Sequence, residues 1–160
     1  MMSIALKLPN SKNCFACGME NEAGLKLAIY KDGKGGVFGD YTIPKHLEGY
    51  PGIAHGGIVT TLLDEAISRV YMQQNPNRFM YTAKLTIRFR KHVPVEQPLH
   101  MTGAWIKDRG RTAEAEAKLF SADGELLAEG EALLIALPPE DMAPADLQEL
   151  GWRVYPDLLS

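Results

Sequence analysis

This chain of 160 residues has few cysteines, no excess of positive charge and no long hydrophobic run. Each of these absences argues against one class of function. Its two cysteines supply at most two ligands of a zinc site, so no metal centre is expected. The formal net charge of −3 leaves no basic excess to neutralise the phosphates of a nucleic acid. No apolar run is long enough to cross a bilayer, and the first residues lack the pattern of a signal peptide. We therefore expect a cytoplasmic protein with neither a nucleic-acid nor a membrane partner.

The remaining composition is that of an ordinary soluble domain. The hydrophobic share is 46% and the charged share 23%, which allows a chain of this length to bury one core. Prolines predict a linker over residues 138–144, followed by a short helix over residues 145–152. We therefore expect one domain over residues 1–137, with its core at about 25–137, and a C-terminal extension over residues 138–160.

Hydrophobic periodicity predicts one long helix from Gly57 to about Gln74. Its apolar residues recur at four-residue steps, as Ile58 and Val59, Leu62 and Leu63, Ala66 and Ile67, and Val70 and Tyr71. Its other face is polar and holds Thr60, Thr61, Asp64, Glu65 and Ser68. The sequence Asn75-Pro76-Asn77 ends the helix.

Alternating patterns of apolar and polar residues predict strands before and after this helix in the sequence. They cover residues 25–30, 37–43, 83–90, 99–107, 113–119 and 125–137. In the strand over 83–90 the apolar positions are Ala83, Leu85, Ile87 and Phe89. A period of two predicts an antiparallel sheet with one solvated face. That face is basic on the strand over 83–90 and acidic on the last two strands, so we expect cross-strand ion pairs. The fold class is α+β, with the helix lying across the sheet.

The start of the predicted helix carries the sequence Ala54-His55-Gly56-Gly57. A helix start presents unpaired amides and a partial positive charge, and glycines let a ligand approach them. Such amides can hold a carbonyl oxygen as it gains negative charge. The glycine pair is also explained by a tight turn into the helix, and on the pair alone we favour that simpler interpretation.

Asp64 is the second candidate group, because aspartate has a poor helix propensity in mid-helix, where no cap explains it. A solvated surface aspartate and a functional one fit the pattern equally well. If the sheet encloses the helix, an unpaired buried carboxylate is costly, and this favours a function.

Gly56 and Asp64 are eight residues apart, which is about 12 Å along a helix. A carbonyl held at the amide and a water held by the acid must approach to about 3 Å. One chain therefore does not easily supply both groups to one site. Two antiparallel helices from two subunits can do so, and a two-fold dimer would then have two equivalent sites.

The segments AHGGIVTTLLDEA and YTAKLTIRFRKHVP resemble the hotdog-fold acyl-CoA thioesterases of the phenylacetate-pathway and 4-hydroxybenzoyl-CoA type. The resemblance covers about residues 49–137, and NCFACG with the later GLKL is similar to a subgroup of the superfamily. It implies a hotdog fold, in which an antiparallel sheet wraps around one central helix. It also implies homodimers that pair into homotetramers, hydrolysis of an acyl- or aryl-CoA, and no cofactor besides the coenzyme A of the substrate.

The resemblance also implies roles for single residues. The amide of Gly56, with Gly57 beside it, is the oxyanion donor, and Asp64 of the other subunit is the general base or, alternatively, a nucleophile. Thr82 matches a residue that positions water, and His55 shapes the loop and holds the thioester. Some relatives use an Asn or Gln in the loop before His55, whereas this chain reads Glu-Gly-Tyr-Pro over residues 48–51.

Coenzyme A carries phosphates, so its site needs cations. We select Arg109 and Arg111 in the turn over residues 108–111, together with Lys91, although a solvated turn explains the same residues. Cys14 and Cys17 are interpreted as small buried thiols, because no second pair completes a zinc site and the setting of a redox motif is missing.

Two other functions stay open. One is a hotdog dehydratase acting on acyl thioesters, because His46 and the loop after it faintly match the loop of such enzymes. The other is a non-catalytic acyl-CoA-binding domain. Hydrolysis releases free coenzyme A, dehydration changes only the acyl chain, and a binding domain does neither.

Overall fold

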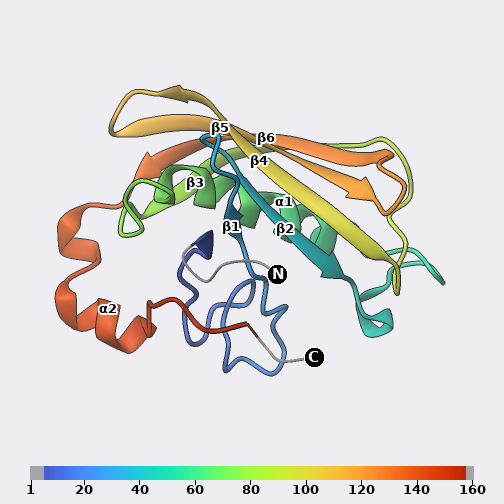
Figure 1. The fold of residues 1–160 in the computed structure, drawn as a ribbon, viewed down its shortest axis with the longest axis horizontal. Helices are drawn as coiled ribbons and strands as arrows, with labels where there is room; N and C mark the ends of the chain where they lie inside the picture. The colour runs from blue at the N-terminus through green and yellow to red at the C-terminus, as the bar shows by residue number, and fades with distance from the viewer. Residues whose placement is uncertain (1–5, 158–160) are drawn as a thin grey trace.

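The structure of the protein is a computed structural model, in which residues 6–157 are described. A six-stranded antiparallel sheet curves around one side of helix α1 (Gly56–Arg69), as Figure 1 shows. The strands are β1 (Tyr30–Lys31), β2 (Val37–Thr42), β3 (Met80–Phe89), β4 (Pro98–Asp108), β5 (Thr112–Ser121) and β6 (Leu126–Ala136). Their order is β1-β2-β4-β5-β6-β3, so β3, the first strand after the helix, lies at one edge. The predicted α+β class and hotdog fold are confirmed.

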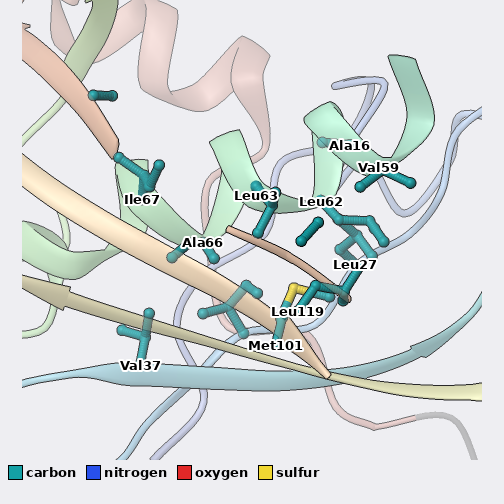
Figure 2. Close-up of a cluster of buried hydrophobic side chains, with 14 of the residues drawn as sticks. Ala16, Leu27, Val37, Val59, Leu62, Leu63, Ala66, Ile67, Met101 and Leu119 are labelled. Atoms are coloured by element: carbon teal, nitrogen blue, oxygen red, sulfur yellow. The ribbon is translucent and has the colours of Figure 1, made fainter. Parts of the chain in front are cut away.

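Helix α1 forms because its apolar repeat faces the sheet. Val59, Leu62 and Leu63 are almost completely buried, and they pack with Met101 and Leu119 of the sheet (Figure 2). This contact gives the molecule its core, and the polar residues of the helix, Asp64 among them, lie outside it.

The helix is shorter than predicted, because it ends at Arg69 and not near Gln74. A 3₁₀ turn, η3 (Val70–Met72), follows it. In this turn the hydroxyl of Tyr71 donates to the carbonyl oxygens of Lys107, at 3.0 Å, and of Glu114. These two bonds tie the tightened end of the helix to the β4–β5 hairpin.

The predicted strand over residues 25–30 joins the sheet only at its end, in β1. Leu25, Leu27 and Ile29 are buried, which accounts for the alternating pattern. Their backbone bonds go elsewhere: the amides of Leu25 and Leu27 donate to residues 15 and 16, and the carbonyl of Ile29 accepts from residue 8. This part of the chain runs along the side of α1 away from the sheet, as Figure 1 shows.

The C-terminal extension lies on the same side of α1 as the N-terminal segment (Figure 1). The predicted linker contains a 3₁₀ turn, η4 (Pro139–Asp141), and the predicted terminal helix is α2 (Pro144–Leu150). This helix ends before residue 152 because Gly151 adopts a left-handed φ of 67°. The chain then runs back, and the amide of Asn10 donates to the carbonyl of Arg153 at 2.8 Å. Within residues 6–157, no helix is both long and apolar enough to cross a membrane.

Candidate active site

The start of α1 presents one free amide. The Nδ1 atom of His55 accepts a hydrogen bond from the amide of Gly57 at 2.9 Å and so caps the helix. The amide of Gly56 has no hydrogen-bond partner among residues 6–157. An accepting Nδ1 requires a neutral imidazole with its proton on Nε2. Of the two predicted glycines, Gly56 therefore has the available donor, while Gly57 serves the cap.

The two glycines also differ in their steric surroundings. A Cβ atom on Gly57 would lie 3.1 Å from Nδ1 of His55, a tight contact that would press on the cap. A Cβ atom on Gly56 would meet Phe89 at 3.5 Å, which is an ordinary contact. A side chain at Gly56 is therefore compatible with the fold of the chain, whereas a side chain at Gly57 disturbs the helix start.

A groove of about 760 Å³ opens beside the free amide. It is lined by Ile53, Ala54, Gly56, Val59 and the segment from Phe89 to Val93. Lys91, a predicted phosphate ligand, thus lies in the same groove as Gly56, and its ammonium group forms an ion pair with Glu125. Arg90 pairs with Glu129 at 3.3 Å, which confirms the predicted cross-strand ion pairs.

The structure brings together the predicted residues Asp64 and Thr82. The hydroxyl of Thr82 on β3 donates to Oδ1 of Asp64 on α1 at 2.7 Å. The Oδ2 atom accepts no hydrogen bond from any residue that the structure describes, and it is not a buried orphan. Asp64 therefore has one oxygen fixed by the protein and one left free for a ligand.

A β-bulge explains why Thr82 reaches the helix. The pairing of β3 with β6 shifts register between Thr82 and Lys84. Strict alternation places Ala83 on the inner face with Leu85, and this prediction was wrong, because Ala83 is exposed. The extra residue turns Thr82 toward α1 instead, as bulges commonly re-aim a side chain next to a functional site.

Burial raises the pKa of Asp64 above the ordinary value of an aspartate, although the hydrogen bond from Thr82 opposes this shift. The neighbouring Glu65 raises the pKa further. Glu65 itself turns away from Asp64 and binds Arg69 at 2.7 Å. The result is a carboxylate of increased basicity, which is the property that a general base needs.

The other polar side chains of this helix face are occupied within the helix. The hydroxyls of Thr60 and Thr61 donate to the carbonyls of Gly56 and Gly57, at 2.8 and 2.9 Å. These two threonines therefore satisfy their hydroxyls locally and leave Asp64 to Thr82.

Gly56 and Asp64 lie on one unbroken helix, eight residues and therefore about 12 Å apart. The structure does not bring these two predicted residues together within one chain.

Arg109 and Arg111 also lie away from Gly56, in the turn between β4 and β5. The same hairpin binds Tyr71 at the C-terminal end of α1, the end opposite Gly56. Arg109 pairs with Glu114 at 3.1 Å. Arg111 is exposed and forms no ion pair or side-chain hydrogen bond within residues 6–157. Of the two arginines, only Arg111 has a guanidinium group that is free for a ligand.

Two residues near the predicted site residues were not predicted from the sequence. Phe89 is one of the apolar positions of the predicted strand over residues 83–90, yet its side chain is 51% exposed and lines the groove beside Gly56. Its place at the end of an alternating strand, directly before a basic segment, could have indicated this position.

Arg78 was not predicted either. Its guanidinium binds both oxygens of Asp108, at 2.8 and 2.7 Å, and holds the pKa of Asp108 at about 2.

The interpretation of both cysteines as small buried thiols was wrong for one of them. Cys17 is buried, but Cys14 is exposed at the surface of the N-terminal segment. Neither lies in the groove beside Gly56. Within residues 6–157, no group of three or more potential metal ligands is present.

Comparison with known proteins gives consistent results. The family model of the thioesterase superfamily matches residues 51–128. The acyl-coenzyme A thioesterase THEM4 of Bos taurus is 30% identical over 136 residues, which cover 79% of this chain and 52% of that protein. The chain spans about half the length of the curated relatives it matches.

Two solved structures extend the comparison. A thioesterase superfamily protein superimposes with a TM-score of 0.70 at 26% identity, covering 76% of this chain and 59% of the other. The Escherichia coli PaaI protein, from the phenylacetic acid degradation operon, superimposes with a TM-score of 0.65 at 16% identity, covering 71% and 81%. The latter likeness supports the fold.

Proposed function

We propose that this chain is a thioesterase of the superfamily whose family model matches residues 51–128, and that it hydrolyses an acyl- or aryl-CoA to the free acid and coenzyme A. The observation that carries the proposal is the state of two groups on α1. Gly56 has a free amide at the helix start, and Asp64 has one oxygen fixed by Thr82 and the other free. Together they supply an oxyanion donor and a base for water.

Because of the distance between these two groups, the proposed site requires a dimer. About 12 Å separates them along α1, whereas the attacked carbonyl and the attacking water must come within about 3 Å of each other. Two antiparallel α1 helices, related by a two-fold axis, would place Gly56 of one subunit beside Asp64 of the partner subunit.

The edge strand β3 supports such a dimer. One side of this strand pairs with β6, and the other forms no ladder within residues 6–157. Tyr81 and Phe89 are large apolar side chains on it that are 47% and 51% exposed. A long open edge with apolar side chains favours pairing with another strand, here that of a second copy. The pairing of dimers into tetramers stays a prediction from the family resemblance.

The proposed reaction uses few groups. The thioester carbonyl accepts a hydrogen bond from the amide of Gly56, and Asp64 of the partner subunit takes a proton from a water molecule. The hydroxide attacks the carbonyl carbon, the tetrahedral oxyanion is stabilised at the helix start, and the C–S bond then breaks. An unperturbed thiol has a pKa of about 8.5, so the thiolate leaves without a strong general acid.

The same antiparallel arrangement accounts for the position of Arg111. It would bring the 108–111 turn of one subunit, which lies at the C-terminal end of α1, to the end where the partner subunit has its groove. We propose that the free guanidinium of Arg111 binds a phosphate of coenzyme A, and that the ammonium of Lys91 binds another when it leaves its ion pair with Glu125.

The experiment that tests this function is thiol release from a panel of acyl- and aryl-CoAs. We expect wild-type protein to release stoichiometric coenzyme A and free acid, and Asp64→Asn to be slower by about 10²–10⁴-fold. A change in the acyl chain without thiol release would instead identify a dehydratase. Saturable binding without either reaction would identify a binding domain.

A further inference from the structure

Cys14 and Cys17 form a structured pair that the proposed hydrolysis does not use. The amide of Gly18 donates to the carbonyl of Cys14 at 2.7 Å, which closes a single turn around the two cysteines. A Cβ atom on Gly18 would lie 2.4 Å from this carbonyl oxygen, so the turn requires glycine. The hydroxyl of Ser11 connects the two cysteines, because it accepts from the amide of Cys14 at 3.2 Å and lies 3.5 Å from the sulfur of Cys17.

The two thiols have different surroundings, so they have different chemistry. Cys14 is exposed, whereas Cys17 is 2% exposed and lies 3.5 Å from the hydroxyl of Ser11. The hydrogen bond from Cys17 lowers the pKa of Cys14 to about 6, although partial burial opposes this shift. The same hydrogen bond, together with burial, raises the pKa of Cys17. Cys14 is thus the accessible thiol with the lowered pKa, and Cys17 is the buried thiol with the raised pKa.

The exposed thiol opens into an acidic groove of about 390 Å³. The groove is lined by Asn13, Cys14, Met142 and Leu150 together with the carboxylates of Asp141, Asp146 and Glu149. A negative potential at this site disfavours anionic reagents and favours neutral or cationic ones.

We propose that Cys14 and Cys17 are a reversible dithiol–disulfide couple that reacts with low-molecular-weight disulfides of neutral or positive charge. The thiolate of Cys14 attacks one sulfur of the small disulfide, forms a mixed disulfide and releases one small thiolate. Cys17 then loses its proton and attacks the sulfur of Cys14, which releases the second small thiol. The protein dithiol is oxidised by two electrons, and the small disulfide is reduced to two thiols.

Cystamine, a cationic disulfide, provides the test on the full reduced chain. Mass spectrometry of the wild type should show the loss of two hydrogens in the peptide that contains both cysteines, reversed by dithiothreitol. Cys17→Ala should stop at a stable mixed disulfide on Cys14, and Cys14→Ser should lose the reaction. A first adduct on Cys17, or a mixed disulfide in the wild type that never resolves, would overturn the assignment.

A second measurement does not depend on variants of the buried cysteine. Alkylation of Cys14 by iodoacetamide in the wild type should reach its half-maximal rate near a pH of about 6. A half-maximal rate near about pH 8.5, which is the pKa of an ordinary thiol, would contradict the proposal.

The charge preference has its own control. Cystamine should react faster than oxidised glutathione, which is anionic, and adding salt should reduce the difference. The double variant Asp141→Asn with Glu149→Gln should narrow the ratio of the two rates, whereas Asp123→Asn, in the distant β5–β6 turn, should not. Equal rates for both disulfides, or an unchanged ratio in the double variant, would refute the selectivity.

Discussion

The hydroxyl of Thr82 donates to Oδ1 of Asp64 at 2.7 Å, and this bond joins the edge strand β3 to the middle of helix α1. It fixes the orientation of the carboxylate and leaves Oδ2 free of protein partners among residues 6–157. A base held in this way needs no reorganisation when it takes a proton from water.

Thr82→Val should shift the pH dependence of hydrolysis. Asp64 acts as a base only when ionised, so kcat/KM should fall as the pH drops through its pKa. Burial already raises the pKa of Asp64, and the hydrogen bond from Thr82 lowers it. Removing that bond should move the acidic limb of the kcat/KM profile to higher pH and reduce kcat. An unmoved limb, or one at lower pH, would contradict the role of Thr82.

Asp64→Asn should stabilise the fold at neutral pH while it impairs hydrolysis. Burial raises the pKa of Asp64 above its value in the unfolded chain, so proton binding favours the folded state. This stabilisation is complete below the pKa of Asp64 in the unfolded chain, and it is lost as the pH rises through the pKa of Asp64 in the folded protein. At about pH 7 the wild type therefore has an ionised, half-buried carboxylate, whose cost the amide avoids.

Urea unfolding at two pH values measures this effect. The variant should have the larger free energy of unfolding at about pH 7, and its advantage should shrink near pH 4, close to the pKa of an ordinary aspartate. A wild type more stable than the variant at both pH values would show that the carboxylate serves the fold.

Gly56→Pro should remove the proposed oxyanion donor without breaking the helix. Gly56 is the first residue of α1, where proline is well tolerated, and the extended backbone of His55 before it (φ −60°, ψ 135°) suits a following proline. Loss of one oxyanion donor typically lowers kcat by about 10²–10³-fold. Gly56→Ala, which adds a Cβ atom but keeps the amide hydrogen, is the matched control. If alanine is as damaging as proline, the effect is steric and the donor role fails.

Arg111→Glu should raise KM for acyl-CoA more than for an acyl-pantetheine, which lacks the nucleotide. Arg109→Glu should have the smaller effect, because its guanidinium is already paired with Glu114. Steady-state kinetics with both substrates separates the phosphate contribution from a general disturbance of the turn. An equal rise in KM for the two substrates would exclude phosphate binding by Arg111.

Much of this arrangement was predictable from local patterns. The apolar repeat of α1 and the turn signals between strands depend on neighbouring residues, so they are readable from the sequence. The orientation of Thr82 was not, because a bulge against β6 decides it. The short β1 was also unpredictable, since Leu25 and Leu27 are buried by the N-terminal segment without joining the sheet. The pairing of Arg109 with Glu114 likewise requires the hairpin geometry.

The most direct test of a site shared between subunits is complementation between Gly56→Pro and Asp64→Asn. Each variant alone lacks one group at both sites, so each should be nearly inactive. After equal amounts are unfolded together and refolded, half of the dimers should be mixed, and one of the two sites in each mixed dimer has both groups intact. The shared site predicts recovery of about a quarter of wild-type activity. If both groups act within one chain, the mixture will stay as inactive as the separate variants, and that result would contradict the account.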